Sequence, residues 1–303
     1  MTVSIIIPTY NYGEFIADAL HSVEVQTMTD LECIVIDDAS MDDTASVVGS
    51  FADRDPRFRY IRLDRNSGVS AARDRGFKEA QGEFIQMLDA DDVIAPRKLE
   101  LQVAFLKEHQ DTDLVYSNFV PFKDRPDLGR KGEYRADEQL SGSGQHIIRR
   151  LLRGNIFRLN TVLFRSSVLD HIGGFLTGFR YAEDWDFWLR IASQGHHFQF
   201  FDVPDAISGV RRNPRSLSSD LQSMSKHYLP VLQNLWNRGR LSVRNRVELV
   251  LRYALFLLDR TVLRKGPVLL LPEGRWPFLV FVGGVMLLMI PIYPFYKLAQ
   301  AVR

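Results

Sequence analysis

The sequence contains very little cysteine and no excess charge of either sign. Its 303 residues include one cysteine, Cys33, which lies inside an apolar run, so no disulfide can form within the chain. That content fits a reducing compartment. The 38 basic and 37 acidic residues nearly cancel, so the composition implies no overall field that would attract nucleic acid. We therefore expect no nucleic-acid partner.

Several targeting and nucleotide-binding motifs are also missing. The first apolar run, Val3–Ile7, is too short for a signal peptide and has no basic leader. No GxGxxG motif follows this run, and no GxxxxGK[ST] motif occurs in the chain, which disfavours a dinucleotide site and excludes a P-loop. The length suffices for one large domain with a sizeable core and an appendage.

Short apolar runs alternate with amphipathic stretches through the first ninety residues, as in an α/β protein. The expected strands are Val3–Ile7, Leu31–Ile36, Phe58–Leu63 and Phe84–Leu88. The expected helices between them are Glu14–Gln26, Thr44–Phe51 and Ser70–Ala80. This alternation predicts a mostly parallel sheet with helices on both faces. Three of the strands end in polar or acidic loops, which would then lie along one edge of the sheet.

The most informative stretch is the end of the fourth run, where Asp89, Asp91 and Asp92 follow directly. In an open α/β sheet, ligands bind beyond the carboxyl ends of the strands. Carboxylates this close together repel one another unless they share a cation. Oxygen ligands of this kind suit Mg²⁺ or Mn²⁺ together with substrate phosphates. The alternative is a solvated acidic turn that caps a helix beginning near Pro96.

Four further features have both a functional and a structural interpretation. Asp38, after the second strand, suits a nucleoside or caps a turn. Arg73 suits a diphosphate or lies on the surface. The cluster Arg211–Arg215 is either a phosphate clamp or a solvated loop. In Glu183–Trp188, carboxylates beside tryptophans suit a sugar, with Asp184 as a general base, or form a capped and partly buried helix.

Together these segments resemble a family 2 glycosyltransferase of the GT-A fold. They occur in the family's order and at family-like spacing over roughly residues 1–218. The matching segments are Val3–Asn11, Ile36–Ser40, Asn66–Gly68 with Ala72–Arg73, Leu88–Asp92, and Gly174–Phe175 followed by Glu183–Asp186.

The resemblance implies a fold and a set of nucleotide-binding residues. The fold would be an open mixed sheet flanked by helices. Pro8, Thr9 and Tyr10 would line the nucleoside pocket, Asp38 would contact the base, commonly uracil, and Arg73 would lie near the nucleotide. The donor would then be a nucleotide-sugar, UDP-linked in the commonest case.

The resemblance also implies a reaction. Asp89 would lie near the ribose and the metal, and Asp91 would hold Mg²⁺ or Mn²⁺ against the diphosphate. Asp184 would be the catalytic base of an inverting single displacement onto an acceptor hydroxyl of a glycan or lipid-linked acceptor. One departure concerns Asn213, which stands where many relatives carry histidine, so the third contact to the metal and diphosphate is left open.

Two other functions remain compatible with these residues. A polyprenyl-phosphate glycosyltransferase also uses this fold beside membranes, with a phosphate as acceptor. A catalytically silent nucleotide- or glycan-binding module would bind the same ligands without turnover. The intact set of Asp38, Asp89, Asp91 and Asp184 favours the enzyme over the silent module.

The C-terminal part is hydrophobic. Trp276–Tyr296 contains no charge and has about the ~20 residues that a helix needs to cross a bilayer. Three prolines interrupt it and leave Phe278–Ile290 as the longest clean helix, while aromatic and basic residues flank it as interface anchors do. We expect membrane contact, spanning or re-entrant, with the catalytic domain at the cytoplasmic face of the cell membrane. A buried C-terminal helix or an oligomer interface is the alternative.

The expected domain organisation follows from these segments. A GT-A catalytic domain would span 1–218, a helical extension 219–263, and a hydrophobic membrane-associated segment 264–303.

Overall fold

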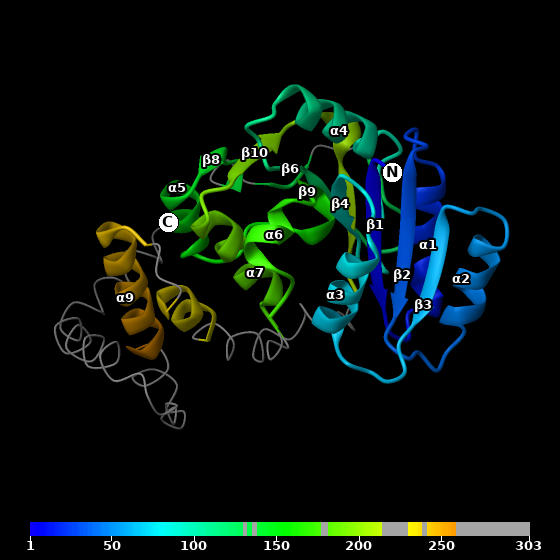
Figure 1. The fold of residues 1–303 in the computed structure, drawn as a ribbon, viewed down its shortest axis with the longest axis horizontal. Coiled ribbons are helices and arrows are strands. Elements are labelled where there is room, and N and C mark those ends of the chain that lie inside the picture. Colours follow the sequence, from blue (N-terminus) through cyan, green and yellow to red (C-terminus); the bar gives the residue numbers. More distant parts are fainter. Residues whose placement is uncertain (130–131, 135–137, 177–180, 214–229, 238–240, 259–303) are drawn as a thin grey trace.

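An eight-stranded mixed sheet organises the chain, with strand order β3-β2-β1-β4-β9-β6-β10-β8 (Figure 1). The computed structural model describes residues 1–129, 132–134, 138–176, 181–213, 230–237 and 241–258. Three short strands form a second sheet in the order β5-β11-β7, and they follow β4, β10 and β6 of the first sheet, respectively, along the chain. The fold is thus the open mixed sheet flanked by helices that the sequence predicts.

The strands of the large sheet are β1 (Val3–Thr9), β2 (Leu31–Asp37), β3 (Phe58–Arg62), β4 (Phe84–Met87), β6 (Leu114–Ser117), β8 (Gly142–Ser143), β9 (Val162–Arg165) and β10 (His197–Phe201). Those of the small sheet are β5 (Val93–Ile94), β7 (Phe119–Phe122) and β11 (Ser208–Arg211). The helices are α1 (Gly13–Glu24), α2 (Thr44–Ala52), α3 (Val69–Glu79), α4 (Lys98–Glu108), α5 (Gln145–Leu151), α6 (Val168–Ile172), α7 (Glu183–Ser193) and α9 (Val243–Leu258), with 3-10 turns η2 (Leu159–Thr161) and η3 (Pro204–Ala206).

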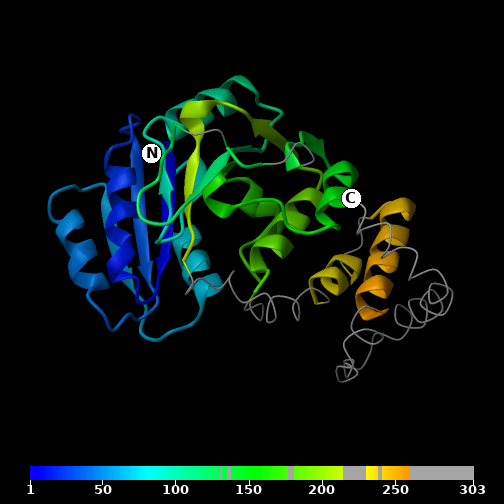
Figure 2. The same cartoon turned by 180° about the vertical axis from the view of Figure 1, so that it is seen from behind.

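The central strand β1 is buried on both faces, and its alternate side chains enter different cores. Ile5 and Ile7 pack with α1, α2 and α4, whereas Ile6 packs with the cluster beneath α5 and α7. Figure 2 shows the blue helices α1 and α2 covering one face, with α3 behind the sheet. The period-2 alternation of a strand places neighbouring side chains on opposite faces. A strand that is buried at every position therefore occupies the middle of the sandwich.

Strand β1 continues past the position where the sequence predicts its end. Pro8 was expected to stop the strand after Ile7, yet β1 runs through Pro8 to Thr9 and pairs with Ile36 of β2 there. On the other side, β4 pairs with β1 only as far as Ile6. Proline removes a backbone donor. Because no β4 residue pairs with Pro8, the missing N–H leaves no ladder hydrogen bond unmade.

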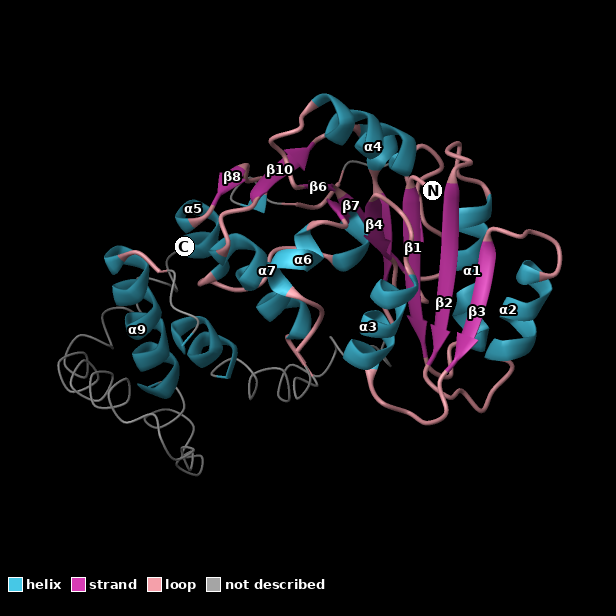
Figure 3. Ribbon diagram, in the orientation of Figure 1, coloured by secondary structure: helices cyan, strands magenta, loops and turns pink. Residues whose placement is uncertain are grey.

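The expectation of a mostly parallel sheet holds for its first half only. Strands β3, β2, β1 and β4 are parallel (Figure 3). Strand β9 lies between β4 and β6 and runs antiparallel to both. Strand β8 is antiparallel to β10. The direction of β9 depends on where the chain returns to the sheet, and local pattern does not encode that return.

Glycine at position 82 is required by a close backbone approach, and its substitution gives a first prediction. A Cβ at Gly82 would lie 2.5 Å from the backbone nitrogen of Ser4. Gly82→Ala is therefore expected to lower the free energy of unfolding by about 1–3 kcal/mol, because overpacking against backbone cannot relax. Urea denaturation measures the change.

Gly49→Ala is the matched control for this prediction. Gly49 lies inside α2 with nothing within 4 Å of a built Cβ. Alanine in a helix interior is favoured over glycine by about 0.5–1 kcal/mol, so this variant should gain stability. Equal effects of the two substitutions would contradict the assignment of Gly82 as a packing-limited position.

The C-terminal extension docks onto the catalytic fold through α9. Asn245 of α9 donates to the backbone oxygen and the side-chain oxygen of Gln145, at 3.0 and 2.8 Å, at the start of α5. Within the ranges that the structure describes, no helix is both long enough and apolar enough to cross a membrane. The predicted membrane segment 276–296 and both predicted domain boundaries, at 218 and 263, lie outside the described residues.

Candidate active site

The three carboxylates after β4 lie at the edge of the sheet, and two of them are buried. Asp89 is 38% exposed at its side chain, whereas Asp91 and Asp92 are 8% and 5% exposed. Asp92 accepts hydrogen bonds from the Asn160 side chain at 2.9 Å and from the Arg211 backbone at 2.7 Å. Asp92 is thus a buried residue that fixes the loop, and it is not part of a solvated turn that caps a helix, since no side chain caps the start of α4.

Asp91 is held in a site that penalises its negative charge. Burial and the neighbouring Asp89 carboxylate raise the pKa of Asp91 to about 6, although the Asn213 amide, 3.2 Å away, lowers it. Burial and both neighbouring carboxylates raise the pKa of Asp92 well above its usual range. A cation between these groups would offset their repulsion.

The residues present fit a divalent metal ion held jointly with a phosphate. Asp89, Asp91 and the amide oxygen of Asn213 are hard oxygen donors, which Mg²⁺ and Mn²⁺ accept. No group of three or more His, Cys, Asp or Glu side chains suited to a metal occurs among the described residues. Mg²⁺ commonly binds through one or two carboxylates plus substrate phosphates. The donor set is therefore that of a metal ion whose coordination the substrate completes.

Arg73 connects the acidic loop to the start of α7. Its guanidinium is 4% exposed and donates to Asp89 at 2.9 Å and to Glu183 at 2.7 Å. The guanidinium also lies over the ring of Phe175, 5.2 Å from its centroid. Arg73 is therefore not the surface arginine that the structural interpretation expected, and its predicted place near a nucleotide stays a prediction. Through Asp89 and Glu183, Arg73 brings the end of β4 and the first turn of α7 together.

Asp184, the predicted base, is the second residue of α7 and is only partly buried. Its Oδ1 accepts a hydrogen bond from the Trp185 backbone at 2.7 Å. Burial and the adjacent Glu183 carboxylate raise the pKa of Asp184 to about 7, against the opposing effect of Arg73. A carboxylate with this pKa is half ionised at neutral pH and can accept a proton there.

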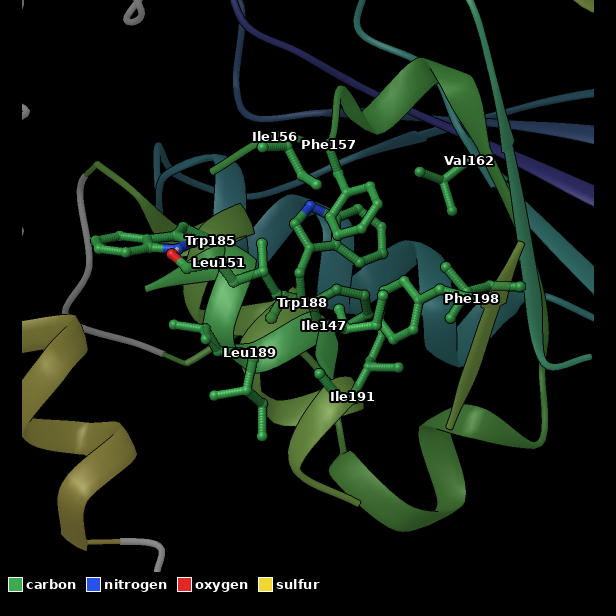
Figure 4. Close-up of a cluster of buried hydrophobic side chains, with 14 of the residues drawn as sticks. Ile147, Leu151, Ile156, Phe157, Val162, Trp185, Trp188, Leu189, Ile191 and Phe198 are labelled. Atoms are coloured by element: carbon green, nitrogen blue, oxygen red, sulfur yellow. Dashed lines mark hydrogen bonds between the residues drawn. The ribbon is translucent and has the colours of Figure 1, made fainter. Parts of the chain in front are cut away.

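Arg190 fixes α7 against the turn before it, and an aromatic stack fixes α7 against α3. Arg190 donates to Asp186 at 2.7 Å and to the backbone oxygens of residues 172 and 174, so α7 holds the preceding turn. Phe187 stacks on Phe175 with centroids 4.5 Å apart, and Phe77 of α3 stacks on both. Trp188 and Phe157 meet edge to face deeper in the same core (Figure 4). These contacts fix the position of α7 and so of Asp184 in its first turn.

The residues predicted to border a nucleoside lie at the ends of β1 and β2. The carboxylate of Asp38 accepts backbone hydrogen bonds from Ser67 at 2.7 Å and Gly68 at 2.8 Å, which fixes the turn before α3. Each oxygen retains a lone pair, so the predicted base contact of Asp38 stays a prediction. Thr9 is buried with no hydrogen-bond partner for its hydroxyl among the described residues, and Tyr10 is 39% exposed.

Backbone strain in the described part of the chain gathers around this site. The non-glycine residues with positive φ there are Asn11 (55°), Ala39 (65°) and Ala182 (60°). They follow β1, follow β2 and precede α7. Such conformations cost energy and persist where the surrounding structure imposes them, commonly at functional sites. Asn11 and Ala39 lie in two of the strand-end loops that the sequence singled out, and Ala182 directly precedes Glu183–Trp188.

The side chain of Arg211 binds other residues of the protein, so its donors are not free to clamp a phosphate. It donates to the Asp18 side chain at 2.5 Å and to the backbone oxygens of Asp91 and Lys123 at 3.0 and 2.9 Å. Its side chain is 7% exposed and lies over Phe122, 4.5 Å from the ring centroid. Of the basic cluster, Arg212 is exposed, and Arg215 lies outside the described residues.

The structure also identifies residues that the sequence did not single out. Glu183 pairs with Arg73, Asn160 holds Asp92, and Asn155 donates to Asp184 at 2.7 Å. Glu183 stood inside a recognised motif without a role. Asn155 and Asn160 lie in the connection between α5 and β9, where a single sequence gives no sign of their roles.

Comparison with known proteins decides the family. The model of glycosyl transferase family 2 matches residues 4–183. The chain belongs to glycosyl transferase family 2. The matched segment runs from β1 to the first residue of α7 and includes the acidic loop after β4, but it ends one residue before Asp184. The match therefore includes Asp38, Arg73 and the acidic loop but not Asp184.

Relatives of this family 2 chain carry glycosyltransferase names. It is 38% identical over 106 residues (35% of this chain, 42% of the relative) to the Bacillus subtilis protein named "Putative teichuronic acid biosynthesis glycosyltransferase TuaG". Uncharacterized glycosyltransferases of Rickettsia felis and Rickettsia typhi are each 30% identical, over 63% and 82% of this chain and 30% and 74% of their own lengths. The chain thus spans less than half of the length of TuaG and of the Rickettsia felis protein.

Solved structures show the same fold. Staphylococcus aureus TarS 1–349 in complex with UDP superposes with a TM-score of 0.61 at 22% identity, covering 88% of this chain and 73% of TarS 1–349. The Pyrobaculum calidifontis mannosyltransferase PcManGT, in complex with GDP-Man and Mn²⁺, gives 0.58 at 21% identity over 99% and 84%. At this identity the likeness establishes the fold of the family 2 domain.

Proposed function

We propose that this chain is an inverting, metal-dependent glycosyltransferase that moves a sugar from a nucleotide-sugar, UDP-linked, to an acceptor hydroxyl. The observation that carries the proposal is the Arg73 bridge, which joins Asp89 at 2.9 Å to Glu183 at 2.7 Å. The bridge holds the acidic loop, which would bind the donor diphosphate, close to the start of α7. There Asp184, whose pKa is about 7, would act as the base. TarS and PcManGT, which share the fold, were solved with UDP and with GDP-Man and Mn²⁺.

The residues of the chain would divide the reaction between donor and acceptor. Asp89 and Asp91 would hold Mg²⁺ or Mn²⁺, which when bound stabilises charge on the departing diphosphate. Pro8, Thr9 and Tyr10 would border the nucleoside.

Asp184 would take the proton of the acceptor hydroxyl as its oxygen attacks the anomeric carbon. The bond from that carbon to the diphosphate breaks on the opposite face, so the configuration inverts. The proton ends on Asp184 and the negative charge on the nucleoside diphosphate.

The wider role proposed is the assembly of cell-surface polysaccharide or glycolipid at the cytoplasmic face of the cell membrane. The name of TuaG refers to teichuronic acid biosynthesis, which supports such an acceptor. The uncharged stretch 276–296 supports membrane contact.

A panel of nucleotide-sugars tests the proposal. Thermal shift with UDP-glucose, UDP-galactose, UDP-N-acetylglucosamine and GDP-mannose, with Mn²⁺ or EDTA, identifies the donor, because a ligand of the native state stabilises it. Release of the nucleoside diphosphate then measures turnover. Nucleotide binding without turnover would indicate the silent module. Product that forms only when polyprenyl phosphate is added would indicate the polyprenyl-phosphate transferase.

Asp91→Asn is expected to lower Mn²⁺-dependent turnover by about 10²–10³-fold, because a metal ion contributes several kcal/mol to the transition state and each 1.4 kcal/mol is tenfold. The variant should fold, because it removes a carboxylate whose ionisation burial already disfavours. Turnover against Mn²⁺ concentration measures both the metal affinity and the maximal rate. Asp205→Asn, at a 61% exposed carboxylate, is the matched control and should leave both unchanged. Wild-type turnover and Mn²⁺ dependence in Asp91→Asn would contradict the metal assignment.

A further inference from the structure

Asn155, in the connection between α5 and η2, contacts the proposed base. Its Nδ2 donates to Oδ2 of Asp184 at 2.7 Å, and its Oδ1 accepts the backbone N–H of Phe157 at 3.1 Å. An amide whose oxygen is engaged by a donor must present its nitrogen on the other side. The Phe157 backbone therefore fixes which end of Asn155 faces the carboxylate.

The connection that carries Asn155 is tied to α7 on both sides. Before it, the indole nitrogen of Trp185 donates to the backbone oxygen of Leu151 at 2.8 Å. After it, Phe157 packs edge to face on Trp188 and stacks on Phe198, with centroids 5.6 and 5.2 Å apart. Figure 4 shows these side chains filling the space between the connection and the helix. The separation of Asn155 from Asp184 is thus set by a packed core.

Asp184 receives one hydrogen bond on each oxygen. Oδ1 accepts from the Trp185 backbone and Oδ2 from Asn155, and each oxygen keeps a lone pair for a substrate proton. Asn155 is itself exposed, so the contact lies at the open side of α7. An acceptor hydroxyl approaching from solvent would meet a carboxylate whose plane is already fixed.

We propose that Asn155 is a positioning residue of the transfer reaction, which holds the Asp184 carboxylate in its ionised form and in one orientation toward the acceptor. This inference rests on the proposed role of Asp184 as the base. Asn155 acts through Asp184 and not on the sugar itself. Hydrogen bonding to the charged form of a carboxylate favours that form.

The electrostatic setting makes this contribution measurable. The charged groups that face Asp184 are Glu183 on α7, Arg73 on α3 and Asp89 after β4. Glu183 and Asp89 disfavour the ionised base and Arg73 favours it, while burial raises its pKa to about 7. Removing the Asn155 donor leaves one hydrogen bond on the carboxylate, so the pKa of Asp184 rises further.

The experiment is a pH profile of kcat/KM for nucleotide-sugar hydrolysis with Mn²⁺, using the UDP-sugar that the wild-type protein turns over. The acidic limb is the low-pH side of this profile, where kcat/KM rises as the base ionises. Asn155→Ala should move this limb to higher pH by about one unit, because the free energy of a hydrogen bond to a charged group corresponds to a pKa change of about one unit. The rate would then be about tenfold lower at pH 6 and return toward wild type above pH 9. Asn155→Asp places two carboxylates together, and its limb should move up further.

Asn234→Ala is the matched control, because its acceptor Asp186 lies on α7 with Asp184. Asn234 donates to Asp186 at 2.5 Å, so this variant removes the same kind of amide–carboxylate bond from a carboxylate that pairs with Arg190. It should change thermal stability and leave the acidic limb in place. Asn155 is exposed, so at pH 5, where Asp184 is protonated, its variants should keep the wild-type melting temperature.

The possible outcomes separate this inference from the proposed function. An acidic limb that stays in place in both Asn155 variants, or a loss of rate that is uniform over pH, overturns the role of Asn155 alone, provided that Asp184→Asn is inactive. Wild-type activity in Asp184→Asn overturns the base assignment and this inference with it. A limb that moves up in Asn155→Ala and further in Asn155→Asp, but not in Asn234→Ala, supports it.

Discussion

Asp184→Asn is expected to lower turnover by about 10³-fold while nucleotide binding persists. General-base catalysis contributes about 10²–10⁴-fold, and an amide of the same size cannot accept the acceptor's proton. Asp184 stands on α7, whereas the predicted nucleoside and metal residues stand on the ends of β1, β2 and β4. The loss should therefore fall on kcat, with donor binding close to wild type by calorimetry. Asp170→Asn, at an exposed carboxylate of α6, is the control and should retain full activity.

Relative to the wild-type protein, the same Asp184→Asn variant is expected to become more stable as the pH rises. The folded pKa of Asp184 lies near 7, above its value of about 4 in an unfolded chain, so the native state binds the extra proton between these values. Ionisation of Asp184 thus costs native stability progressively from about pH 4 to pH 7, and asparagine removes that cost. The difference in unfolding free energy between variant and wild type should be larger at pH 8 than at pH 5. Equal differences at both pH values would show that the fold does not raise the pKa of the Asp184 carboxyl.

Arg73→Met is expected to lower the free energy of unfolding by about 3 kcal/mol. Breaking a buried ion pair costs about 3–5 kcal/mol because a charge is left without its partner. Glu183 is 10% exposed and loses a 2.7 Å contact, while Asp89 is 38% exposed and loses less, because water screens it. Urea denaturation at pH 7.5 measures the change. Removing Arg73 also withdraws a positive charge from Asp184, so the acidic limb of activity should move to higher pH.

Arg75→Met provides the control for Arg73 on the same helix. Arg75 is 47% exposed and pairs with Glu79 at 2.7 Å, four residues along α3. Exposed pairs of this kind contribute about 0.3–0.5 kcal/mol. Adding Glu183→Gln to Arg73→Met should recover part of the lost stability, because it removes the unpaired charge. A loss in Arg73→Met no larger than in Arg75→Met would show that the bridge does not hold the two halves of the site together.

The sequence by itself predicted the parts of the site that depend on local pattern. The apolar run before Asp89 had to be a strand, and a strand that ends in carboxylates places them at the edge of the sheet. The same reasoning placed Asp38 after β2 and Asp184 at the start of α7. Each of these follows from hydrophobic period and turn chemistry within about ten residues, which the chain encodes wherever it folds.

Some local predictions were displaced by neighbouring strands. Pro8 was predicted to end the first strand. The N–H that proline lacks would point toward β4, but β4 pairs with β1 only as far as Ile6, so β1 continues past Pro8 without losing a hydrogen bond. The small sheet of β5, β11 and β7 was not predicted, since β5 has two residues and pairs with β11 more than a hundred positions later. Pairings of that separation depend on chain return and not on local propensity.

Only the tertiary structure decided what each charged side chain does. The sequence offered Arg73 and Arg211 as two equivalent candidates for phosphate. The fold places Arg73 between Asp89 and Glu183, and Arg211 between Asp18 and the backbone of Asp91. It also brings Asn155 to Asp184 across 29 positions. The partner of a long polar side chain is set by the packing of distant elements, so one-dimensional pattern places the residue and three-dimensional packing assigns its role.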